Sequence, residues 1–150
     1  MSTEFNVVKE QYEKAREAER RELAGYLSKD KELASRGITV RRRGNTGKGK
    51  SEYTSGKRIY KVDLRNWKWV QLDDAAHGFL CIISLNMPDI DPNSGNIHSL
   101  LDRVGVIITY KREKLYYKTE IITDIDLPLN AGDMEKIAEL ILEQYDFLVK

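Results

Sequence analysis

The chain has 150 residues, of which 41% are hydrophobic and 33% are charged, and its formal net charge is +1. This length fits one compact domain with a core, while the high charge suggests that part of the chain is a solvated helix or tail. The single cysteine, Cys81, excludes a disulfide framework within the chain, and its longest apolar run is far below the roughly 20 residues of a membrane span.

Residues 1–35 form the first of three zones and are predicted to be a charged amphipathic helix. This zone has one glycine and no proline, and is rich in strong helix formers. Its apolar stripe is thin and is interrupted by Glu19 and Glu22; its members are Phe5, Val8, Tyr12, Ala15, Leu23 and Tyr26. Such a helix needs a surface to pack on, so a homo-oligomer or larger complex through this helix is expected. No apolar segment near Met1 resembles a signal peptide, and we expect a cytoplasmic protein.

Residues 36–57 are predicted to be a basic, flexible linker. Between Arg36 and Lys61 there are nine basic residues and one acid, a net charge of +8, so the rest of the chain carries −7. Five glycines fall between Gly37 and Gly56, and we interpret Arg43–Gly56 as a loop. The near-neutral total therefore hides a strong separation of charge.

Residues 58–150 are predicted to be an α+β body. Alternating apolar residues and turn signals predict five strands, at Arg58–Leu64, Asn66–Leu72, Phe79–Asn86, Arg103–Lys111 and Leu115–Ile125. A final helix is expected to start near Asn130, a favourable N-cap, with an apolar face that covers one side of the sheet. The predicted fold is thus an N-terminal charged helix, a basic linker, and an antiparallel sheet of about five strands covered by a C-terminal helix.

The segment Gly44–Ser51 matches the phosphate-loop pattern G-x-x-x-x-G-K-[ST], in which Lys50 would neutralise a phosphate and Ser51 would hold Mg²⁺. That motif requires a buried strand before it and a helix after it. Here three arginines precede the match, and a strand pattern follows it. A phosphate-loop nucleotide-binding protein is therefore kept only as an alternative.

Other reactive residues form no complete catalytic or metal set. Asp89–Gly95 carries alternating oxygen ligands, but the glycine falls one position late for a calcium loop and no Glu follows at the twelfth position. His77 and His98 each lie near acids, without a serine in a nucleophile elbow. Cys81 lies in the most apolar predicted strand, which favours an inert thiol. We therefore predict a non-enzymatic protein with no metal and no cofactor.

The basic zone and the aromatic residues that follow it give the preferred functional interpretation, nucleic-acid binding. The basic side chains could track a phosphate backbone, and if Val70 and Leu72 pack inward, Trp67 and Trp69 stand on the outer face of their strand beside Arg65. Two buried tryptophans remain the competing interpretation. The predicted nucleic-acid-binding residues are Arg41, Arg42, Arg43, Lys48, Lys50, Lys57, Arg58, Arg65, Trp67 and Trp69.

A second alternative is a protein-binding module, either an assembly subunit or an inhibitor of a nucleic-acid enzyme, whose basic zone docks on an acidic protein surface. The small size, charged helical start and basic glycine-containing segment resemble accessory proteins of phages and mobile elements. This resemblance is one of general organisation, and it implies an accessory role without assigning a residue to it.

Overall fold

The structure is a computed structural model that describes residues 3–44, 50–55, 58–63, 68–85, 89–90 and 103–149, with side chains described in 14–44, 68–85 and 104–149. It confirms the α+β class: an N-terminal helix, a five-stranded antiparallel sheet and a C-terminal helix. None of the described helices is long and apolar enough to cross a membrane.

The N-terminal zone forms two helices, α1 (Thr3–Ser28) and α2 (Lys31–Ser35), where one was predicted. Asp30 separates them as the N-cap of α2, since its Oδ1 accepts a hydrogen bond from the backbone N–H of Leu33 at 3.0 Å. The C-terminal helix α4 (Ala131–Leu148) begins at the predicted cap. Asn130 and Asp133 exchange side-chain and backbone hydrogen bonds of 2.8 and 3.0 Å, which is a capping box.

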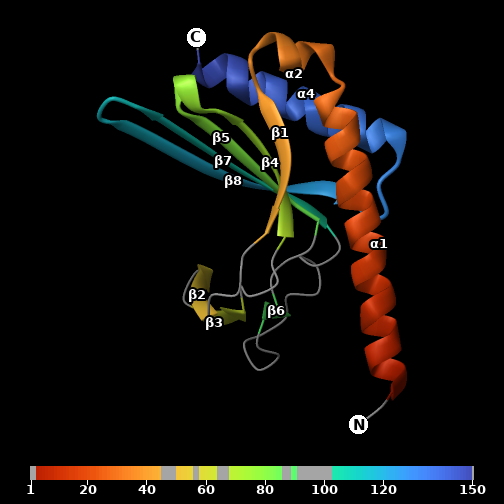
Figure 1. Cartoon of the computed structure of the whole chain (residues 1–150). Coiled ribbons are helices and arrows are strands. Elements are labelled where there is room, and N and C mark those ends of the chain that lie inside the picture. Colours follow the sequence, from red (N-terminus) through yellow and green to blue (C-terminus); the bar gives the residue numbers. More distant parts are fainter. Residues whose placement is uncertain are drawn as a thin grey trace.

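Five antiparallel strands form the main sheet, in the order β1-β4-β5-β7-β8. Their bounds are Thr39–Gly44, Lys68–Asp74, Phe79–Ser84, Arg103–Arg112 and Leu115–Asp126. A separate three-stranded sheet has the order β2-β3-β6, with bounds Lys50–Ser55, Arg58–Asp63 and Asp89–Ile90 (Figure 1).

The main sheet thus differs from the predicted set of strands in one member. The strand expected at Arg58–Leu64 is β3, which belongs to the small sheet, and its place in the main sheet is taken by β1. The segment 39–44 was assigned to a flexible linker, yet it pairs with β4 along its whole length, from Thr39 opposite Asp73 to Gly44 opposite Lys68. The linker predicted to start at residue 36 is therefore wrong for this segment, because long-range pairing gives the arginine run a regular extended conformation.

One face of the main sheet holds the hydrophobic core. Alternate residues of the inner strands are buried there, and α1, α2 and α4 contribute side chains to the same cluster. The fully buried members include Leu23, Leu33, Val70, Leu72, Ile83, Val106, Ile108, Ile137 and Ile141. Figure 1 shows the N-terminal part of α1 continuing well past the end of the main sheet.

Candidate functional site

Pairing between β1 and β4 sorts the arginine run onto two faces of the sheet. Residues directly opposite in an antiparallel pair point to the same face. Val40 and Arg42 lie opposite Leu72 and Val70, which are fully buried in the core. Arg41, opposite Gln71, and Arg43, opposite Trp69, therefore lie on the outer face.

Trp69 lies on the outer face of β4 and is half-buried there. Its Nε1 donates to Oε1 of Gln71 at 3.2 Å, and Nε2 of Gln71 donates to Oδ2 of Asp73 at 2.9 Å. This row of hydrogen bonds along β4 fixes the orientation of the indole. The structure therefore meets the condition left open by the sequence for these residues, with Val70 and Leu72 inward and Trp69 outward.

Acidic residues of the chain pair with part of the basic run. Arg42 Nη1 lies 3.2 Å from Glu17 Oε1, and Lys68 Nζ lies 3.9 Å from Glu17 Oε2. Arg41 Nε lies 3.8 Å from Asp73 Oδ2. These pairs are partly exposed, and such pairs are individually weak, roughly 0–1 kcal/mol. The carboxylates therefore reduce the positive charge of this region without removing it.

Glu17 lies at the centre of this charge cluster. Besides Arg42 and Lys68, it accepts a 2.9 Å hydrogen bond from Arg20, a buried residue of the same helix. That hydrogen bond, aided by the charges of Arg20, Lys68 and Arg42, holds the pKa of Glu17 below its usual value. The carboxylate is thus ionised at neutral pH.

An open pocket of about 420 Å³ lies where α1 meets β1 and the start of β4. Its lining combines four basic residues, one acid, one glycine and one tryptophan: Arg20, Arg42, Arg43, Lys68, Glu17, Gly44 and Trp69. Positive charge beside an aromatic ring suits a ligand that has both an anionic group and a flat ring.

The structure brings four of the ten predicted binding residues together at this pocket and on the adjoining outer face: Arg41, Arg42, Arg43 and Trp69. The described part of the chain does not include Lys48, Lys57, Arg65 or Trp67, and it gives no side-chain position for Lys50 or Arg58, which lie in β2 and β3. Sequence reasoning missed Glu17 and Lys68. Lys68 could have been noticed as the neighbour of Trp69, whereas Glu17 carries no local signal.

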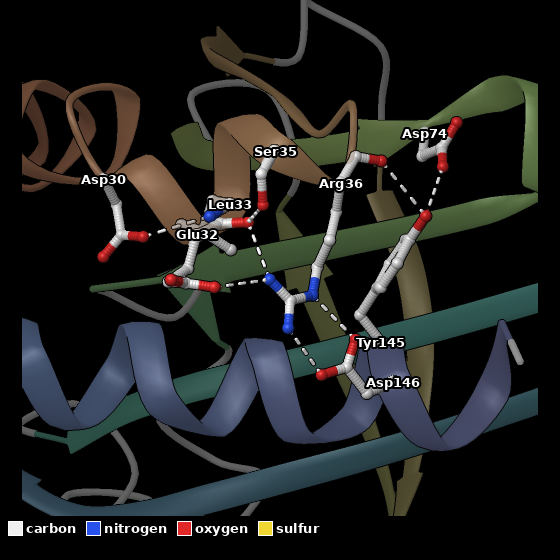
Figure 2. A network of polar contacts seen from close by, with 8 residues as sticks. All are labelled: Asp30, Glu32, Leu33, Ser35, Arg36, Asp74, Tyr145 and Asp146. Carbon is white, nitrogen blue, oxygen red and sulfur yellow. Dashed lines mark hydrogen bonds and ion pairs between the residues drawn. The ribbon is translucent and has the colours of Figure 1, made fainter.

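A second polar cluster ties the helices to the far end of the sheet (Figure 2). Arg36 makes two 2.7 Å hydrogen bonds to the carboxylate of Asp146 on α4, and its Nη1 donates to the carbonyl and carboxylate oxygens of Glu32 at 2.9 and 3.0 Å. The Tyr145 hydroxyl lies 2.6 Å from Oδ2 of Asp74 and 3.2 Å from the carbonyl oxygen of Arg36. This cluster joins α2, β4 and α4.

The expected proximity of a histidine to an acid is confirmed in the same cluster, because His77 Nδ1 lies 2.6 Å from Asp74 Oδ2. Burial acts to raise the pKa of Asp74, but hydrogen bonds from Tyr145 and His77 outweigh it and hold that pKa below its usual value. Burial and the Asp74 charge raise the pKa of Tyr145 to about 12. His77 and Tyr145 both hydrogen-bond to Asp74, so this part of the cluster connects β4 with α4.

The other candidate motifs gain no support from the described residues. β2 starts at Lys50, so a strand stands where the phosphate-loop pattern requires a helix. Cys81 is fully buried, and burial raises the pKa of its thiol. Asp89 and Ile90 form β6, whereas 91–95 and His98 lie outside the described residues. Within the part that the structure describes, no three metal-ligating side chains gather.

Comparison with known proteins adds no further constraint, because no protein-family model, curated protein or solved structure matches this chain.

Proposed function

We propose that this protein is a non-enzymatic accessory protein that binds single-stranded nucleic acid at the pocket between α1, β1 and β4. The observation that supports this proposal is the lining of the pocket, which combines Arg42, Arg43 and Lys68 with the half-buried Trp69. Arg43 shares the outer face of the sheet with Trp69. A nucleotide has the matching chemistry, an anionic phosphate joined through a sugar to a flat base.

Each side chain has a defined role in this proposal. Arg43 and Lys68 contact phosphate oxygens, and Trp69 offers a ring face on which an unpaired base stacks. Stacking of a base on an aromatic side chain is worth about 1–3 kcal/mol. Arg41 extends the basic surface along the outer face of β1, where it tracks the next phosphate.

The internal ion pairs do not prevent this binding. The pairs from Glu17 to Arg42 and Lys68 span 3.2 and 3.9 Å at a partly exposed position, so a phosphate can take over one of the cations at little cost. A base stacked in the pocket also needs to be unpaired, which favours a single strand over a duplex.

The test is fluorescence anisotropy with a labelled single-stranded oligonucleotide, over a series of salt concentrations. We expect binding that weakens steeply with salt, a loss of about tenfold in affinity for Trp69→Ala, and partial recovery in Trp69→Phe because the ring face is kept. Arg43→Ala should weaken binding and reduce the slope of log affinity against log salt concentration by about one phosphate contact.

Matched controls are available on exposed surfaces away from the pocket. Arg112→Ala at the end of β7 and Phe147→Ala on α4 remove an exposed arginine and an exposed aromatic residue, and they should leave binding unchanged. Absence of binding to any DNA or RNA oligonucleotide at low salt would refute the proposal. Binding that survives Trp69→Ala but not Arg43→Ala would contradict the stacking role of Trp69 and leave only recognition of the phosphate charge.

A further inference from the structure

β8 forms one edge of the main sheet and presents apolar side chains to solvent. It is 12 residues long, and its only hydrogen-bonded neighbour among the described strands is β7. Leu115, Tyr116 and Ile122 are 60%, 62% and 51% exposed. A long edge strand has a row of backbone N–H and C=O groups that can pair with another strand, so it calls for a partner or for protection.

The opposite edge of the sheet, β1, has such protection. Arg41, Arg42 and Arg43 are exposed along it, and α1 packs beside it. Pairing of β1 with a second copy of itself would bring the two arginine runs together, and charges of one sign disfavour that approach. The two edges therefore differ in what they can accept.

The sequence of β8 is complementary to its own reverse about Thr119. If Thr119 lies opposite Thr119 of a second copy, the three facing pairs on each side of the centre have opposite charge or combine an aromatic ring with a branched aliphatic group. Within β8 the facing pairs are Lys118 with Glu120, Tyr117 with Ile121, Tyr116 with Ile122, and Leu115 with Thr123.

Neighbouring registers lack this complementarity. A twofold axis perpendicular to the sheet leaves the inner and outer faces on their own sides, so only residues of the same face can lie opposite each other. Such an axis must therefore pass between one residue and its own copy in the second chain. A centre at residue 118 places Lys118 opposite Lys118, and a centre at residue 120 places Glu120 opposite Glu120. Only the centre at Thr119 sets Lys118 against Glu120, both of which are half-exposed on the outer face.

We propose that two copies of this chain associate through antiparallel pairing of their β8 strands, centred on Thr119. The association joins the two main sheets into one continuous sheet and buries Tyr116 and Ile122 of each copy against the other. The salt bridge between Lys118 and Glu120 within one chain, at 3.3 Å, is replaced by two between the copies. This interface differs from the oligomer expected through the N-terminal helix, and it does not depend on the proposed nucleic-acid binding.

Charge exchange tests both the interface and its register. Sedimentation equilibrium over a concentration series should give twice the monomer mass for the unmodified protein. Lys118→Glu and Glu120→Lys should each shift the protein to monomer, because like charges then face each other twice. An equimolar mixture of the two variants should recover the dimer, since every Glu at 118 or 120 again faces a Lys. An unmodified protein that stays monomeric, single variants that still dimerise, or a mixture that stays monomeric would each overturn the proposal.

A cysteine introduced at the centre gives a second, independent test. The Cα atoms of directly opposite residues lie about 4.5–5.5 Å apart, within the range that a disulfide spans. Thr119→Cys should therefore form a covalent dimer on mild oxidation, while buried Cys81 stays out of the reaction. Thr123→Cys is the matched control, because its two copies would lie roughly 27 Å apart at about 3.4 Å per residue. Equal cross-linking of the two variants, or none of Thr119→Cys, would contradict the register.

Discussion

Gly78 and Lys111 meet so closely that only a residue without a side chain fits between β5 and β7 at this point. Gly78 has a φ of +71°, and its carbonyl oxygen accepts a 2.9 Å hydrogen bond from the backbone N–H of Lys111. A Cβ atom at Gly78 would lie 1.9 Å from the carbonyl oxygen of Lys111. The turn between β4 and β5 therefore depends on this glycine for both its backbone conformation and its contact.

Gly78→Ala is predicted to destabilise the protein by at least about 3 kcal/mol, because the left-handed strain adds to a clash with backbone. Gly37→Ala is the matched control. Gly37 has a similar φ of +79°, but a Cβ there would meet nothing within 4 Å. Its cost should be about 1 kcal/mol, from conformation alone. Urea unfolding of the two variants measures both effects, and equal losses would contradict the role of the Lys111 contact.

Asp74→Asn is predicted to destabilise the protein by about 1–3 kcal/mol at pH 7, because the amide is a weaker acceptor for Tyr145 and His77. The folded-state pKa of Asp74 lies below the ordinary value of 3.8, so its contribution is present above that pH and is lost as the pH falls through the folded-state pKa. The difference in unfolding free energy between the two proteins should therefore shrink in acid, below about pH 4.

The measurement is urea unfolding at pH 7 and at pH 3, with Glu135→Gln as control for the loss of an exposed carboxylate on α4. The control should change stability by less than about 0.5 kcal/mol at either pH. If the penalty of Asp74→Asn grew on acidification, the hydrogen bonds to the carboxylate would not be its cause.

Arg36 and Asp146 are predicted to couple by about 0.5–1 kcal/mol in a double-mutant cycle. Their paired 2.7 Å hydrogen bonds form a bidentate contact between the C-cap of α2 and α4, although Asp146 is about half exposed. Unfolding free energies of Arg36→Ala, Asp146→Ala and the double variant give the coupling. Arg36→Lys should recover only part of it, because an ammonium group cannot make the two parallel bonds.

Local sequence signals were sufficient for several parts of this structure. Asn130 was recognisable as a cap because the residues that follow it repeat at helical spacing, and the capping box forms there. Alternation from Trp69 to Leu72 was sufficient to predict which residues of β4 share a face, since successive residues of a strand point to opposite faces, whereas the choice of the buried face was left open. In both cases the determining interactions lie within a few residues of the chain.

The features that sequence reasoning missed depend on residues far apart in the chain. The strand conformation of the arginine run depends on pairing with β4, about 30 residues later. The local sequence, which does not contain this partner, therefore predicts a linker. Glu19 interrupted the apolar stripe of α1, yet it is buried, where it bonds Arg16 and accepts from the backbone N–H of Leu129, 110 positions away. The sequence near Glu19 gives no sign of such distant partners, so the position of α1 beside the pocket could not be predicted.

Glu17→Gln is predicted to strengthen nucleic-acid binding, the opposite sign to the other variants of the pocket. The amide can still accept the hydrogen bond from Arg20, which preserves the helix, but it removes the charge that pairs with Arg42 and Lys68. Those two cations then neutralise phosphate more fully, and affinity should rise several-fold at low salt, with the gain shrinking as salt is added.

Glu22→Gln, at an exposed residue of the same helix, is the matched control and should bind as the unmodified protein does. Anisotropy titrations of the three proteins decide the point. If the Glu17 carboxylate only competes with the ligand for Arg42 and Lys68, its removal cannot lower the affinity. Weaker binding by Glu17→Gln would therefore mean that the carboxylate orients these two cations for the ligand.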